Sequence, residues 1–336
     1  MKYFVALLLL VLISGIVTAK SVIAQNSEKY QPDKSGSTKT ESNLWQFEGN
    51  QKSIYENNLA KVTSGFTKDN SVLSAPKGFD LHIWYFGMYD DRYKLRDCNY
   101  GIRSEVRFDF ELFILENGKE IKWIVEPPHF SVFLNNTASG HGSNYCNYEG
   151  YKVQDDDPSL EIPFEKAVAG LCDLFVVFPL ENEIAPGVRL YGDGNLIVFN
   201  PDRPPFWVPV TVKEVMGLMM TYYSIREADK QFVYPYLKEA FDKMTPEELN
   251  APAYNGGDPV FDVTAEKEGL QIMRFNKDYW DRSLPETAIQ FITLHYKFTD
   301  DAEMQESVQN NGHADYPALT VNAINLNSLA GLIRKK

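Results

Sequence analysis

The chain has 336 residues, of which 44% are hydrophobic, 13% are aromatic and 24% are charged. This composition supplies an ample apolar core and excludes intrinsic disorder as the main state. Lysine and arginine total 33 against 46 acidic residues, so the formal net charge is −13. An excess of acidic side chains opposes binding to nucleic-acid phosphates and to anionic membranes, so neither is an expected partner.

The first 24 residues have the pattern of a secretory signal peptide. Lys2 is followed by an apolar run at 3–13, a helix-breaking Ser14-Gly15 pair and an A-x-A-like exit at 22–24. These features correspond to the three regions of an export signal. We therefore predict cleavage after Ala24, a secreted or periplasmic location in a bacterium, and no stable membrane insertion of the mature chain. A retained anchor is the alternative, although the run is shorter than the ~20 residues of a membrane span.

Three cysteines, an odd number, are expected in an oxidising compartment, which predicts one disulfide and one free buried thiol. Cys98 and Cys146 are the first choice for the disulfide because both lie in loop-like segments rich in asparagine and tyrosine, whereas Cys172 resembles a core residue. No spacing of cysteines and histidines is typical of a metal site, and no cofactor fingerprint is present. Neither a metal nor a cofactor is therefore expected.

The first third of the mature chain is predicted to hold one helix and several strands. Residues 25–43 are polar without apolar periodicity and predict a flexible leader. A helix is expected within 44–67 and a strand at 79–86. Asn117-Gly118 predicts a hairpin, since this dipeptide tolerates the positive φ angles of a type I′ turn. The turn sets the register, with the expected pairs Glu116–Lys119, Ile114–Ile121, Leu112–Trp123 and Phe110–Val125.

This register puts most charges of the hairpin on one face of the sheet, namely Arg107, Asp109, Glu111, Glu120, Lys122 and Glu126. The face is either a carboxylate-lined site or a solvated surface with mixed-sign cross-strand pairs, and we favour the surface. A second hairpin is predicted around Asp193-Gly194, with Leu190 opposite Ile197 and Val188 opposite Phe199.

Helical patterns replace strands after Pro209. A capping box at Thr211 and Glu214 opens the first helix, and two further helices are expected at 234–244 and from Pro246. Strands are expected again at 270–275 and 287–298, before an apolar tail at 321–332 that docks on the body.

This order indicates an α+β fold, a mostly antiparallel sheet with a helical insertion in its second half. We predict a mainly antiparallel β lobe at 44–209 and an α+β lobe at 210–336, with a joint at 250–258, or one continuous domain.

The segment 200–209, NPDRPPFWVP, is the most unusual part of the sequence because its four prolines hold the backbone near polyproline geometry. A stiff segment loses little entropy when its side chains bind a ligand. The segment 275–285, FNKDYWDRSLP, has a similar arrangement. The two are either related strand exits whose rings meet across a cleft or a chance match. We predict a ligand-binding site from Arg203, Phe206, Trp207, Tyr279 and Trp280, with rings that cap the core as the alternative.

The same region resembles other proteins. Residues 200–215 (NPDRPPFWVPVTVKEV) and 276–292 (NKDYWDRSLPETAIQFI) are similar to stretches of exported bacterial proteins of unknown function. The resemblance is confined to the C-terminal half of the chain. It implies an exported bacterial protein and assigns no catalytic residue.

Two functions follow from these observations, beside a third interpretation in which the protein is a scaffold with every aromatic ring buried and no large cleft. The first is an exported binding or interaction protein that contacts a small molecule, a glycan, a peptide or a partner protein through the aromatic loops. The alternative is an exported hydrolase whose acid–base groups come from the charged hairpin face, helped by His129 or His141. The acidic run Asp155-Asp156-Asp157 lacks the spacing of a calcium loop and is interpreted as a solvated turn. The exposure of Trp207 and Trp280 tests the first hypothesis, because buried indoles would remove its specific support.

Overall fold

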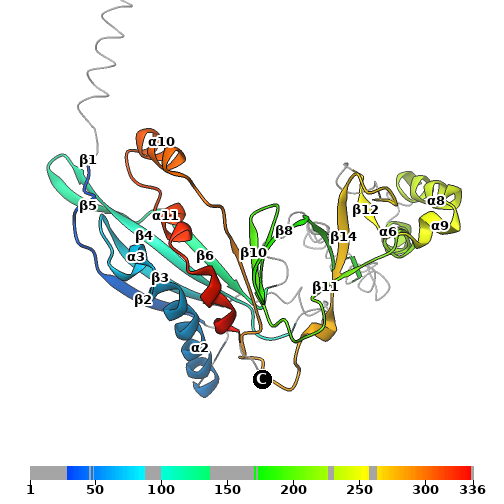
Figure 1. The fold of residues 1–336 in the computed structure, drawn as a ribbon, viewed down its shortest axis with the longest axis horizontal. Coiled ribbons are helices and arrows are strands. Elements are labelled where there is room, and N and C mark those ends of the chain that lie inside the picture. The colour runs from blue at the N-terminus through cyan, green and yellow to red at the C-terminus, as the bar shows by residue number, and fades with distance from the viewer. Residues whose placement is uncertain are drawn as a thin grey trace, which may run out of the picture.

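The computed structural model describes residues 29–44, 47, 49–87, 100–136, 170–171, 173–225, 231–256 and 263–333. Within these ranges the chain has the predicted α+β fold, and its strands form two open sheets rather than one. Figure 1 shows the two sheets one after the other along the long axis, with helices packed against the larger sheet and further helices at the far end, beyond the smaller sheet. The predicted signal peptide, the three cysteines, His141 and the acidic run at 155–157 lie outside the described residues.

The larger sheet has ten strands among the described residues, in the order β2-β3-β4-β6-β15-β10-β9-β8, with β1 and β5 paired to β4. Every neighbouring pair is antiparallel except β2 with β3. The strands are β1 (Lys29–Tyr30), β2 (Thr38–Asn43), β3 (Phe79–Gly87), β4 (Ser104–Glu116), β5 (Lys119–Trp123), β6 (His129–Leu134), β8 (Leu180–Ala185), β9 (Val188–Tyr191), β10 (Asn195–Phe199) and β15 (Phe291–His295).

Helices cover one face of this sheet and form the main hydrophobic core with it. They are α2 (Gly49–Thr67), α3 (Ser71–Ser74), α11 (Tyr316–Asn322) and the 3-10 helix η4 (Leu326–Leu332). The core face of β4 carries Val106, Phe108, Phe110 and Leu112, all fully buried, which confirms the predicted alternation. The expected helix within 44–67 and the docked apolar tail are also confirmed.

The smaller sheet, five-stranded within the described ranges, contains β7 (Leu174–Val177), β11 (Trp207–Pro209), β12 (Tyr254–Asn255), β13 (Val263–Thr264) and β14 (Leu270–Phe275). Three helices lie between β11 and β12 in sequence and cover the outer side of this sheet in Figure 1, namely α6 (Val212–Ile225), α8 (Tyr234–Lys243) and α9 (Pro246–Asn250). The capping box that opens α9 is formed by Thr245 and Glu248. These helices are the predicted insertion.

The two sheets interleave along the chain. Strands β1–β6 belong to the larger sheet and β7 to the smaller one. Strands β8–β10 then return to the larger sheet, β11–β14 belong to the smaller one, and β15 is again in the larger sheet. The predicted boundary at 209/210 therefore does not coincide with a division between the sheets. Residues 254 and 255, within the predicted joint, pair inside the smaller sheet instead.

The predicted flexible leader is wrong for residues 38–43. They form β2, a parallel edge strand beside β3, in which all six residues are exposed. Edge strands of soluble proteins carry polar and charged residues that discourage further pairing, so the polar composition of this segment is compatible with a strand.

The Asn117-Gly118 hairpin is confirmed in its turn and in three of its four expected pairs. Asn117 and Gly118 have φ angles of 50° and 75°, and β4 pairs with β5 in the predicted register. The fourth pair, Phe110–Val125, is not formed, because β5 ends at Trp123.

The hairpin around Asp193-Gly194 exists with a register shifted by one residue, so that Leu190 faces Leu196 and Val188 faces Val198. The turn has three residues rather than two, since the Gly194 nitrogen donates to the Tyr191 carbonyl at 2.8 Å and Gly194 has a φ of 81°. A three-residue loop that ends on a left-handed glycine is a common hairpin connection.

Candidate functional site

The four predicted ligand-binding rings are buried, so the expectation that they project into solvent is wrong. Phe206 and Tyr279 are each 1% exposed, Trp280 is 4% exposed and Trp207 is 8% exposed. They belong to an aromatic cluster between the two sheets, which also includes Phe175, Tyr191, Phe199, Phe275 and Phe291. The core-capping alternative describes their position correctly.

Strand pairing explains why these rings point inward. Trp207 on β11 is the register partner of Phe275 on β14, and the Asn276 nitrogen donates to the Phe206 carbonyl at 2.7 Å. The ring of Phe206 lies 4.8 Å from Phe199 and 5.5 Å from Phe291, measured between centroids. These separations are typical of favourable aromatic pairs, so the cluster joins the two sheets.

The two similar segments adopt the same local structure and meet each other. The Asn200 side chain accepts a hydrogen bond from the Asp202 nitrogen at 3.0 Å, and the Asn276 side chain accepts one from the Asp278 nitrogen at 3.0 Å. Each is a turn in which an asparagine side chain replaces a backbone acceptor. The Asn276 amide also donates to the Pro205 carbonyl at 2.8 Å. The strand exits do meet, as predicted by one of the two alternatives, but within a packed core.

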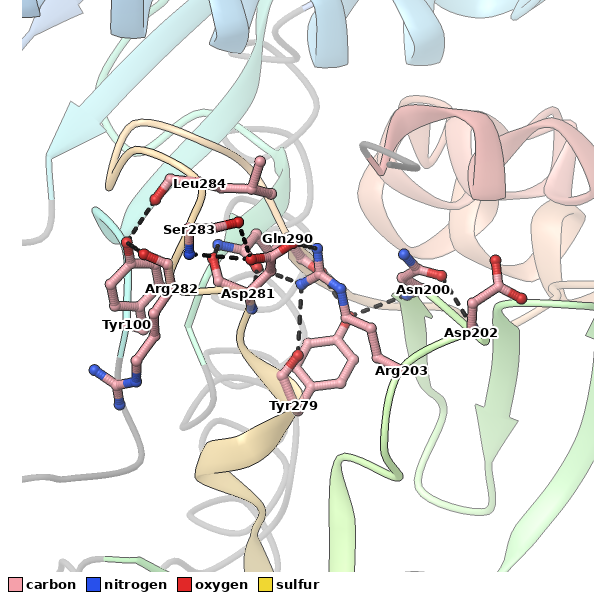
Figure 2. Close-up of polar contacts among 10 residues, drawn as sticks. All are labelled: Tyr100, Asn200, Asp202, Arg203, Tyr279, Asp281, Arg282, Ser283, Leu284 and Gln290. Atoms are coloured by element: carbon pink, nitrogen blue, oxygen red, sulfur yellow. Dashed lines mark hydrogen bonds and ion pairs between the residues drawn. The ribbon is translucent and has the colours of Figure 1, made fainter.

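Arg203, the fifth predicted residue, links the same two segments. Its guanidinium donates to the side chain of Gln290 and to the Tyr279 carbonyl at 3.5 Å, and lies 3.9 Å from Asp281 Oδ2 (Figure 2). Its side chain is 9% exposed. Burial raises the pKa of Tyr279, whose hydroxyl donates to the Gln290 carbonyl at 2.6 Å. Arg203 therefore crosslinks the two segments inside the protein, and its guanidinium is already bound by protein groups.

The charged face of the larger sheet consists of mixed-sign pairs, as favoured from the sequence. His82 Nδ1 lies 3.0 Å from Glu111 Oε1, and His82 Nε2 lies 3.3 Å from Glu41 without the orientation of a hydrogen bond. Lys39 lies 3.2 Å from the same Glu111 oxygen. Both His82 and Glu111 are buried, so this part of the face is less solvated than expected. The pairs join β2, β3 and β4 side by side.

Asp80 is the most extensively bonded carboxylate of this face. Burial raises its pKa, but the hydrogen bonds from Lys122 and from the nitrogen and hydroxyl of Ser37 together lower the pKa below its usual 3.8. The Ser37 nitrogen and hydroxyl lie 2.6 and 2.9 Å from Oδ1. A carboxylate held in this way remains ionised and serves structure rather than proton transfer.

Replacement of Asp80 by asparagine is expected to lower the free energy of unfolding by about 1–2 kcal/mol at pH 7, because charge-assisted hydrogen bonds are lost. A lowered folded-state pKa contributes stability that is present above the unfolded value and is lost as the pH falls through the folded value. The unfolding free energy of Asp80→Asn should therefore fall less steeply below about pH 4 than that of the wild type. Urea titrations at pH 7 and pH 3 measure both effects.

The matched control is Asp242→Asn, which removes an exposed carboxylate paired with Lys238 on α8. Surface pairs of this kind contribute little to stability, so the control should follow the wild type at both pH values. Parallel pH profiles for wild type and Asp80→Asn would contradict the assignment.

A groove with a volume of about 560 Å³ lies where β6 and β15 separate. The two strands pair only through residues 132–134 and 292–294. After His295 the chain leaves the sheet, and a capping box at Asp300 and Glu303 starts α10 (Asp301–Asn311). Helix α11 borders the opening.

The walls of the groove combine convergent polar groups with an apolar surface. The polar residues are His129, Ser131, His295, Lys297, Thr299, Glu303 and Asp315, and the apolar residues are Phe130, Phe133, Pro317, Ala318 and Val321. Seven of these twelve residues are polar, and the convergence of polar groups beside an apolar surface in a concavity of several hundred Å³ is compatible with a small-molecule site.

Nothing in the sequence predicted this groove, although His129 was a candidate acid–base residue. Its residues come from 129–133, 295–303 and 315–321, of which the first lies more than a hundred positions before the other two, and none of the three contains a motif of known chemistry. His129 Nδ1 lies 3.3 Å from the Pro127 carbonyl, and within the described ranges this histidine has no carboxylate partner. The predicted association of His129 with the carboxylates of the charged face is therefore not observed there.

The part of the chain that the structure describes contains no group of three or more His, Cys, Asp or Glu side chains arranged for a metal ion. It also contains no helix that is both long and apolar enough to cross a bilayer. Comparison of the chain with protein-family models, with curated proteins and with solved structures gives no match.

Proposed function

We propose that this chain is an exported binding protein whose ligand occupies the groove between β6, residues 295–299, α10 and α11. The observation that carries the proposal is the convergence of two histidines, a lysine and two acids over an apolar surface in one concavity. The groove replaces the aromatic loops as the binding surface, because the rings of those loops are buried. Export is proposed from the signal-peptide pattern at residues 1–24.

Filling the groove tests the location of the site. Ala318 lines the groove from α11, so Ala318→Trp is expected to weaken any small molecule bound there by at least about tenfold. Ligand-observed NMR with a metabolite library identifies binders to the wild type, and titration calorimetry measures their affinity for the variant.

Ala302→Trp is the matched control, because Ala302 lies on the exposed side of the neighbouring helix α10 and does not line the groove. It should bind as the wild type does. The proposal fails if no library member binds the folded wild type, or if the binders keep full affinity for Ala318→Trp.

Export predicts a specific mature chain. Expression in a bacterium with an intact secretion pathway should give an extracytoplasmic protein that begins at Gln25. Intact-mass spectrometry measures this directly. Recovery of a full-length chain that begins at Met1 would contradict cleavage and favour the retained anchor.

A further inference from the structure

We infer that the groove between β6, α10 and α11 selects an organic anion: a molecule with a carboxylate at one end and an apolar body. The inference rests on the proposed function, which it deepens by naming the class of ligand. Three observations support it. The acids of the groove already contact groups of the protein, two of its nitrogen-bearing side chains keep unused donors, and one side of the groove is apolar.

The two acids of the groove already have partners in the protein. Glu303 Oε2 accepts from the Asp300 nitrogen at 3.2 Å, and Glu303 Oε1 lies 3.6 Å from Lys297 Nζ. Asp315 Oδ1 accepts from the Ala318 nitrogen at 3.0 Å, which caps α11. The hydroxyl of Ser131 donates to Glu105 at 2.6 Å. These contacts give Glu303, Asp315 and Ser131 structural roles, and Lys297 is the cation that faces Glu303.

Two of the nitrogen-bearing side chains keep donors that the described part of the protein does not use. His295, at the end of β15, is exposed and has no hydrogen-bond partner among the described residues. Lys297 has three donors and a single acid partner at 3.6 Å. His129 is not one of these donors, because its Nδ1 faces the Pro127 carbonyl and the neutral ring then offers Nε2 as an acceptor. The donors of Lys297 and His295 favour a ligand that brings acceptor oxygens and negative charge.

The ring of His295 lies against Gly194 in the β9–β10 turn. A Cβ at Gly194 would lie 2.7 Å from His295 Cε1, so the ring packs directly on this glycine. The opposite side of the groove, formed by Pro317, Ala318 and Val321 on α11, is apolar. A ligand that satisfies both sides has a charged end and an apolar end.

Three probes with straight eight-carbon chains and different head groups test the inference: octanoate, octanol and octyltrimethylammonium. Titration calorimetry on the full mature chain is expected to show binding of octanoate, at least about tenfold weaker binding of octanol, and no binding of the cation. His295→Ala should weaken octanoate about tenfold and leave octanol unchanged. His313→Ala, a histidine outside the groove, is the matched control and should bind octanoate as the wild type does.

Equal affinity for octanoate and octanol, or full octanoate affinity in His295→Ala, would overturn the anion preference. If Ala318→Trp still removed that binding, the groove would remain the ligand site and the proposed function would stand. Absence of binding by all three probes would also overturn the inference. The proposed function has its own test, which is the NMR screen of the metabolite library.

Discussion

Replacement of Phe206 by alanine is expected to lower the free energy of unfolding by about 3–5 kcal/mol. The ring is 1% exposed and packs between Phe199 of the larger sheet and Phe275 of the smaller one, so its removal opens a cavity in the region that joins them. Guanidinium denaturation followed by tryptophan fluorescence measures the loss.

Phe232→Ala is the matched control, since Phe232 is 78% exposed and its replacement should change the unfolding free energy by about 0.5 kcal/mol or less. Groove ligands should bind both folded variants equally. A Phe206→Ala protein as stable as the control would show that the ring is not packed in the core, and would restore the aromatic loops as a candidate binding surface.

Replacement of Arg203 by leucine is expected to cost about 3 kcal/mol of unfolding free energy, because a partly buried Asp281 loses its cationic neighbour and Gln290 loses a donor. Addition of Asp281→Asn to this variant should recover part of the loss, since it removes the carboxylate charge that Arg203 faces at 3.9 Å. A thermodynamic cycle built from four denaturation curves gives the coupling between the two side chains.

Arg189→Ala provides the comparison for Arg203→Leu. Arg189 donates to Glu183 at 3.1 Å on the surface hairpin β8–β9, where a pair of this kind contributes about 1 kcal/mol or less. If Arg203→Leu cost no more than Arg189→Ala, the guanidinium would not be an internal crosslink.

The contrast between the two hairpins shows how far local sequence determines register. Asn117-Gly118 is a two-residue turn by its own conformational preference, and the pairs next to it follow from that. Asp193-Gly194 suggests the same turn, but Gly192 joins it to make three residues, so every predicted pair shifts by one. A single additional loop residue exchanges the faces of a strand.

The sequence of the two aromatic segments alone could not predict whether their rings face solvent or the core. The prolines at 201–209 indicate a stiff backbone, and this is independent of which side faces solvent. The pairing of β11 with β14, more than sixty residues later, decides that Phe206 and Trp207 lie between two sheets. The repeated Asn-x-Asp turn was the one local signal that the two segments are structurally related.

The groove was less predictable for a related reason. It arises beyond the last pair of β6 with β15, where the chain after β15 turns away from the sheet toward α10. His129, His295 and Asp315 have no common motif, so only the folded topology brings them together.

The alternation of the chain between the two sheets has a consequence for protein engineering. A cut after β10 would separate β15 from the strand beside it, and a cut before β8 would leave β7 without β14. No single truncation point therefore yields an intact half, and domain-dissection experiments on this protein require circular permutation or paired fragments instead.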